Sequence, residues 1–125
     1  MREKFREDIT IIETQLALSQ DKHHSFILES FKQLLEKIEL ANSSMVGKTT
    51  WSLEQYLERH VIIWSKRSLG CEMKIIKKIS ETSFTPTIIL FLSPEEGRCT
   101  SVIIAEFDLA NDIIDLKDFK IENVI

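Results

Sequence analysis

The sequence predicts an α+β domain in which three helices from the first half of the chain pack on a curved antiparallel sheet of four or more strands from the second half. Apolar residues recur at helical spacing up to about residue 67. From residue 71 onward, β-branched and aromatic residues are interrupted by turn residues about every ten positions. At 125 residues, 43% hydrophobic and 29% charged, the chain is expected to be one domain, 1–125.

The composition excludes several classes of protein. Sixteen Lys and Arg against twenty Asp and Glu give a net charge of -4, so the overall field repels phosphate backbones and nucleic acid is not expected as a partner. No apolar stretch approaches the roughly 20 residues of a membrane-spanning helix. The charged segment 1–8 does not resemble an export signal, and two cysteines make no disulfide framework. We therefore expect a cytoplasmic protein that does not enter a membrane.

Two amphipathic helices open the chain, at 3–19 and 22–41. Each carries apolar residues at steps of three and four, which place them on one face. The first face has Phe5, Ile9, Ile12 and Leu16, and the second has Ile27, Phe31, Leu34 and Ile38. We expect these two helices to pack together and the polar segment 42–50 to form a loop.

A third helix is predicted over 52–67. Ser52 and Gln55 have the spacing of a capping box, in which each side chain satisfies a backbone amide of the first turn. Gly70 is suited to close the helix in a left-handed conformation. The run 61–64 (VIIW) is also β-prone, so periodicity alone leaves the end of this helix open.

The second half predicts a meander of four antiparallel strands joined by short turns. Pro94 and Gly97 favour one turn, and residues 111–112 another. The strands are expected at 71–80, 86–93, 99–109 and 113–123.

The middle of this sheet is apolar on both faces. Ile88, Leu90 and Leu92 point one way while Ile89 and Phe91 point the other. A sheet with one wet face alternates apolar and polar residues, so both faces are expected to be covered. Helices cover one face, and a second copy of the sheet is the simplest cover for the other, which predicts a homodimer. The alternative is a sheet that curls and packs on itself.

The order of elements resembles the nuclear-transport-factor-2-like superfamily, a cone-shaped α+β fold that includes polyketide-cyclase-like proteins and ketosteroid isomerases. The stretch 105–114 (AEFDLANDII) is similar to that family's strand ending in Phe, turn and Ile-containing strand. It departs from the family where Asn111-Asp112 stands in place of Asp-Gly or Asn-Gly. The resemblance implies a pocket between the helices and the concave sheet. The isomerases' catalytic carboxylate, Tyr and protonated Asp have no matching positions here, since the only Tyr, Tyr56, falls on the third helix.

Three further motifs do not lead us to predict a nucleotide site, a metal site or a disulfide bond. Residues 47–49 (GKT) resemble the end of a phosphate-binding loop, but position 42 is Asn and a helix, not a strand, precedes it. His23 and His24 diverge on a helix, so no metal is predicted. Cys71 and Cys99 start strands that are not neighbours and are expected to be buried thiols. No cofactor is predicted.

The candidate ligand site lies on the third helix. Tyr56, His60 and Trp64 recur at steps of four, so one face presents a phenol, an imidazole and an indole. These rings suit a small apolar or aromatic ligand, although the same pattern is typical of core packing. Glu106 and Asp108 share a strand face about 7 Å apart and are candidate acid–base groups opposite His60. Solvated positions at the strand end are the alternative.

Two functions follow as hypotheses. The first is a small-molecule pocket protein that binds or slowly transforms a small apolar or aromatic ligand. The second is a non-catalytic interaction or regulatory domain that acts as a homodimer and fills its interior with its own side chains. A cavity of a few hundred Å³ touching His60 and a carboxylate would favour the first.

Overall fold

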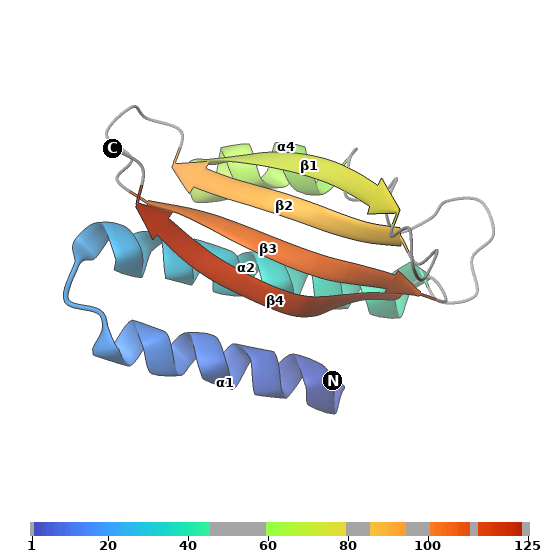
Figure 1. Ribbon diagram of the computed structural model, residues 1–125, viewed down its shortest axis with the longest axis horizontal. Helices are drawn as coiled ribbons and strands as arrows, with labels where there is room; N and C mark the ends of the chain where they lie inside the picture. The colour runs from blue at the N-terminus through green and yellow to red at the C-terminus, as the bar shows by residue number, and fades with distance from the viewer. Residues whose placement is uncertain (1, 46–59, 80–85, 95–100, 111–112, 124–125) are drawn as a thin grey trace.

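The chain forms helices packed on a four-stranded antiparallel sheet, which confirms the predicted α+β class (Figure 1). The computed structural model describes residues 2–45, 60–79, 86–94, 101–110 and 113–123. The helical elements are α1 (Glu3–Leu18), α2 (Lys22–Met45), α4 (Ile62–Trp64) and η2 (Ser65–Leu69), and the strands are β1 (Cys71–Ile79), β2 (Pro86–Pro94), β3 (Ser101–Ala110) and β4 (Ile113–Asn123).

The sheet is a simple meander in the order β1-β2-β3-β4, with every neighbouring pair antiparallel. Phe91 of β2 lies between Lys74 of β1 and Ile104 of β3. A bulge interrupts the β3–β4 ladder between Glu106 and Phe107. Because β1 and β4 are the two edges, these four strands do not close on themselves.

The described helices form a single layer on one face of the sheet. The long helix α2 contacts β2, β3 and β4, while α1 packs on α2 beside β4, and α4 and η2 lie against β1 (Figure 1). Phe31 of α2 stacks at a tilt on Phe119 of β4, with ring centroids 5.1 Å apart. The opposite face of the sheet is turned toward the viewer in Figure 1 with no labelled helix over it.

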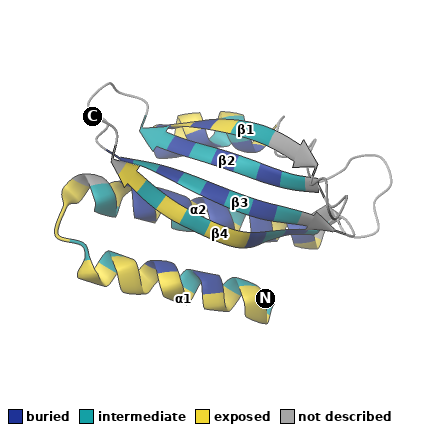
Figure 2. Ribbon diagram, viewed as in Figure 1, coloured by how far each residue is buried: buried dark blue, intermediate teal, exposed yellow. Residues whose placement is uncertain are grey.

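The core lies between this helix layer and the sheet. Side chains alternate along the strands, and in the described parts of β2 and β3 every second one is buried under the helices (Figure 2). Leu90, Ile103 and Ala105 are fully buried at its centre. These residues lie on the strand faces that the sequence predicts to be on one side of the sheet. A register shift of one residue would have moved all of them to the opposite face.

The helix ends differ from the predicted ones in an informative way. Helix α1 ends at Leu18, one residue early, whereas α2 continues to Met45 through part of the predicted loop. Asn42 explains the extension. Its side-chain amide donates to the backbone oxygen of Ile114 at 3.0 Å and its oxygen accepts from the Ile114 amide at 3.0 Å. A polar residue that pairs with β4 thus belongs to the helix face and does not end the helix.

The third predicted helix is described from residue 60. The β-prone run 61–64 is helical, and the helix ends at Leu69, two residues beyond the predicted end. Gly70 closes it in the left-handed conformation, at φ 64°, and its amide donates to the backbone oxygen of Ser65. The capping residues Ser52 and Gln55 lie outside the described residues, as do positions 80 and 99–100 at predicted strand ends.

Candidate functional site

The predicted aromatic site is placed only in part. Tyr56 lies outside the described residues, and His60 is exposed at the start of the helical segment. Trp64 is partly buried and packs against the core, and the Nζ atom of Lys37 lies 5.6 Å from its ring centroid. Trp64 thus takes part in a helix–sheet contact, with a cation–π interaction at its outer side.

Glu106 and Asp108 lie on the other side of the sheet from Trp64. Both project from β3 on the face opposite to the buried residues Ala105 and Phe107. Glu106 pairs across the ladder with Asp118, and Asp108 with Asp115. The structure therefore does not bring these two carboxylates to the indole, and any role they have belongs to the face that has no described helix over it.

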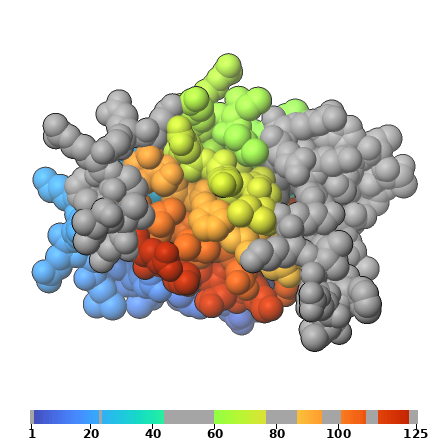
Figure 3. All heavy atoms as spheres, turned by 45° about the horizontal axis from the view of Figure 1, so that its top comes forward, coloured from blue at the N-terminus to red at the C-terminus, as the bar shows by residue number. Residues whose placement is uncertain are grey.

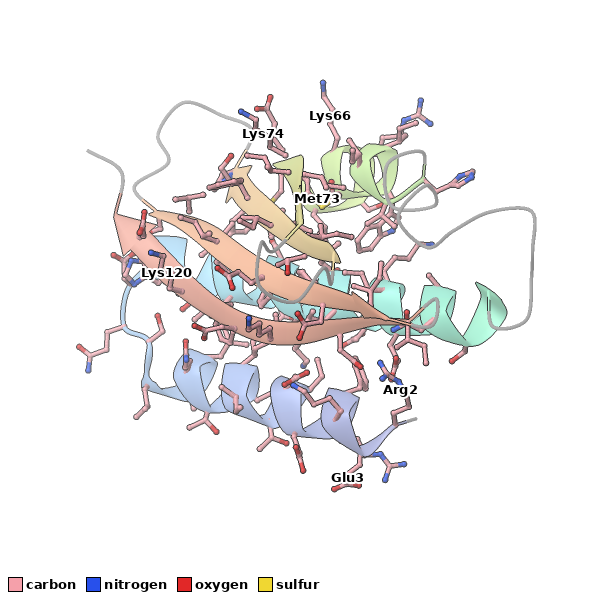
Figure 4. The ribbon with its side chains drawn as sticks, turned by 45° about the vertical axis from the view of Figure 1, so that its right-hand side comes forward. Arg2, Glu3, Lys66, Met73, Lys74 and Lys120 are labelled. Carbon is pink, nitrogen blue, oxygen red and sulfur yellow. The ribbon has the colours of Figure 1, made fainter. Side chains whose placement is uncertain are left out.

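A cluster of polar groups that the sequence did not predict joins the start of α1 to α2 and β4, with Glu39 and Asn42 buried and Arg2 and Asp115 partly exposed. It is here called the N-terminal clasp: Arg2, Glu39, Asn42 and Asp115. Arg2 donates from Nε and Nη2 to the Glu39 carboxylate, at 3.0 and 2.7 Å, and from Nη1 to Asp115 at 2.6 Å. Asn42 donates to the same Glu39 carboxylate at 3.2 Å. Figure 4 shows Arg2 reaching from the start of α1 toward the sheet.

Burial and hydrogen bonding act in opposite directions on the acids around the clasp. Burial raises the pKa of Glu39, but the hydrogen bonds from Arg2 and Asn42 outweigh it, so the pKa falls below its ordinary value. For Asp8, burial raises the pKa and outweighs the ion pair with Lys4 at 2.7 Å. Arg2 and Asn42 thus stabilise the ionised form of the Glu39 carboxyl group.

The hollows at the clasp are small. One has a volume of about 20 Å³, room for about one water molecule, and is lined by the clasp together with apolar residues such as Phe5 and Phe107. A second, of about 70 Å³, is lined by Arg2, Asn42, Ser43 and Ile113. The arrangement ties the start of α1 to α2 and β4, and its charged groups already bind one another.

Two larger hollows lie on the surface formed by the described residues. One, of about 320 Å³, sits at the α1–α2 turn over Leu28 and Ile121, and another, of about 220 Å³, lies beside Lys66 and Met73. The second borders Cys71, whose thiol is fully buried and donates to the Leu69 backbone oxygen at 3.6 Å. A buried thiol held this way is not a reactive nucleophile.

A further candidate surface is the side of the sheet that has no described helix over it, here called the open face. Its apolar side chains are partly exposed and are not among those packed against the core: Ile76, Ile89, Phe91, Val102 and Ile104. In Figure 3 the side chains of all four strands form one continuous surface with no described helix over it. A contiguous apolar patch with a charged border is typical of a protein-interaction site.

The ladder register arranges the centre of the open face into two rows that run across the strands. The basic row consists of Lys74, Phe91, Ile104 and Lys120, and the acidic row of Ile76, Ile89, Glu106 and Asp118. Both rows keep apolar residues on the central strand β2. Lys74 and Lys120 stand on the two edge strands, as Figure 4 shows.

Sequence reasoning detected the open face but missed the clasp. The doubly apolar strands were the signal for the face. The signal for the clasp was weaker: Glu39 and Asn42 share the stripe of α2 that carries Leu35 and Ile38, all of which are buried. A charged residue inside an apolar stripe predicts a buried partner, but not which one.

Comparison of the chain with protein-family models, with curated proteins and with solved structures finds no match in any of the three. No helix within the described ranges is long and apolar enough to cross a membrane. Among the same residues, no three His, Cys, Asp or Glu side chains are grouped to hold a metal ion.

Proposed function

We propose that this chain is a non-catalytic protein-interaction domain that acts as a homodimer through its open face. The observation that carries the proposal is the apolar centre of that face, formed by Phe91 and Ile104 with their neighbours on β1–β3. Burial of such surface drives association, at roughly 25 cal/mol per Å² of apolar area. A second sheet is the natural cover, because flat pleated surfaces pack face to face about 10 Å apart.

The interior favours this interpretation over a small-molecule pocket. Among the described residues, the hollows at the clasp have volumes of only about 20 and 70 Å³, and Trp64 packs against the core. A ligand site around Tyr56 and His60 stays a prediction, since Tyr56 lies outside the described residues. We also propose a distant kinship with the nuclear-transport-factor-2-like superfamily, which the order of helices and antiparallel strands supports at the level of topology.

The size of the face predicts a weak dimer. Four strands at about 4.8 Å spacing and seven residues at about 3.3 Å rise give roughly 450 Å² of flat area per copy. A standard interface buries about 800 Å² per partner, so this one is at the low end. We expect a dissociation constant in the micromolar range, with copies that exchange readily.

Sedimentation equilibrium over a wide concentration range tests the proposal. The wild-type chain should shift from monomer to dimer, and Phe91→Thr or Ile104→Thr should weaken the dimer about 10-fold or more while keeping a strand-forming residue. Leu18→Gln is the matched control, because it removes a 77% exposed apolar side chain from α1. A wild-type chain that stays monomeric near millimolar concentration, or a control that dissociates equally, would overturn the proposal.

A further inference from the structure

We propose that the two copies meet across a two-fold axis that runs across the strands, between the basic row and the acidic row of the open face. The inference rests on the proposed homodimer and adds which residues face each other. In this arrangement each strand lies over its own counterpart, and the basic row of one copy lies over the acidic row of the second copy.

Symmetry limits the choices. A face that packs on a copy of itself with aligned strands must have its two-fold axis in the interface, either along the strands or across them. An axis along the strands between β2 and β3 would place Lys74 opposite Lys120 of the second copy, twice in each dimer. Like charges facing each other across an interface oppose association.

The axis across the strands removes that conflict. It places Phe91 over Ile89 of the second copy and Lys120 opposite Asp118 of the second copy, with both contacts repeated by symmetry. The Phe91–Ile89 contact then falls on the central strand β2, and the Lys120–Asp118 contact on the edge strand β4. Ile104 of β3 lies over Glu106 of the second copy, and Lys74 of β1 lies over Ile76 of the second copy. The contact between opposite charges therefore lies at the rim of the interface, where charged residues are usually found.

The isolated chain leaves a charge conflict on this face. Glu106 and Asp118 stand directly opposite each other across the β3–β4 ladder, where like charges are destabilising. None of the described cations forms an ion pair with either carboxylate. In the proposed dimer, Lys120 of the second copy lies over this acidic pair.

Lys120 is free to turn toward a second copy at small cost. Its side chain is 64% exposed, and its present partner is Glu122, at 2.9 Å and 48% exposed. Ion pairs this exposed contribute little to stability. If Lys120 leaves Glu122 and pairs with Asp118 of the second copy, the monomer therefore loses little stability. The pairing therefore selects an orientation more than it supplies affinity.

A charge exchange between positions 118 and 120 tests this arrangement. Lys120→Glu makes both positions acidic and Asp118→Lys makes both basic, so each variant alone should dimerise about 10-fold or more weakly than wild type. Mixed in equal amounts, the two variants should form a heterodimer, because acid then faces lysine at both contacts. Native mass spectrometry and sedimentation equilibrium measure both effects.

Lys22→Glu and Glu7→Lys are the matched controls, since they make the same charge changes at exposed positions of α2 and α1 and should leave the dimer unchanged. A Lys120→Glu dimer tighter than wild type would overturn the arrangement in favour of the axis along the strands, which brings Lys74 and Lys120 together. If the dimer dissociates on Ile104→Thr but the mixed variants do not associate, the arrangement fails while the open face stands. A monomeric wild-type chain overturns both proposals.

Discussion

The two faces of the sheet carry similar apolar side chains in different surroundings. Phe107 projects from β3 into the core and is 1% exposed, whereas Phe91, on the neighbouring strand, lies on the open face and is partly exposed. The first face is covered by helices of the same chain, and the second has no described helix over it. The apolar residues on a strand face therefore predict that this face is covered. They do not predict whether helices of the same chain or a second copy of the chain cover it.

The largest expected difference is between these two phenylalanines. Phe107→Ala should lower the free energy of unfolding by about 3–5 kcal/mol, because it empties a packed core site. Phe91→Ala should cost about 1 kcal/mol in the monomer, the scale of a cross-strand contact. Urea denaturation at concentrations low enough to keep the chain monomeric measures both. Equal losses would mean that Phe91 is already packed within one chain, and the contrast between the faces would disappear.

The sequence predicted the strands and their faces because alternation is a local property. Ile88, Leu90 and Leu92 were assigned to one side from spacing alone, and all three are fully buried. Cys71 was expected to be buried and is. Each of these assignments depends only on a period of two, which tertiary contacts reinforce.

The clasp could not be predicted in the same way. Arg2 joins Glu39 across 37 positions and Asp115 across 113, and no local pattern links such distant residues. Asn42 falls in the predicted loop because the segment 42–50 is polar and has no apolar periodicity, yet its pairing with the backbone of Ile114 keeps it on the helix. Long-range hydrogen bonds therefore account for both the missed site and the misplaced end of α2.

The clasp should be the most sensitive polar feature on the core side. Glu39→Gln removes the charge that Arg2 and Asn42 surround, and should lower the free energy of unfolding by about 1–3 kcal/mol. Glu13→Gln is the matched control, since Glu13 is 54% exposed and pairs with Lys32 at 3.2 Å. It should change stability by less than about 0.5 kcal/mol. Thermal or urea unfolding that shows equal losses for the two variants would contradict a special role for the clasp.

The contribution of Glu39 to the free energy of unfolding should depend on pH. The pKa of Glu39 is lower in the folded chain than its ordinary value of 4.5, so the unfolded chain binds the proton first as the pH falls. The stability from Glu39 is thus complete above pH 4.5 and is lost as the pH falls through the folded pKa. Glu39→Gln should show a flatter acid loss than wild type in urea titrations at successive pH values.

Asp8 should change the free energy of unfolding in the opposite direction to Glu39 as the pH falls. Its pKa is raised above the ordinary value of 3.8, so its contribution to stability is present below pH 3.8 and is lost as the pH rises through the folded pKa. Wild-type Asp8 therefore partly offsets the acid loss from Glu39. Asp8→Asn should steepen the loss, and a flatter profile for this variant would contradict the assignment.

A small loss of stability is expected on substitution of Gly70, the residue that joins η2 to β1. Its φ of 64° is in the left-handed region, and an added Cβ would meet no atom within 4 Å. Gly70→Ala should therefore cost about 1 kcal/mol from backbone strain alone. Gly70→Asn should cost less, because Asn tolerates this conformation. Urea unfolding of the two variants checks the order.

The relative stability of Gly70→Ala and Gly70→Asn also tests why helices cover only one face of the sheet in the described part of the chain. The left-handed turn at Gly70 directs the chain from η2 into β1 with the helix on the core side, where Leu69 and Met73 are buried. If strain at this turn is the main cost, both variants keep the helix in place, and the proposed dimer at the open face should form as in the wild-type chain. Loss of dimerisation in Gly70→Ala would instead mean that the helix had moved relative to β1, and that the turn, in addition to the apolar pattern, decides which face remains open.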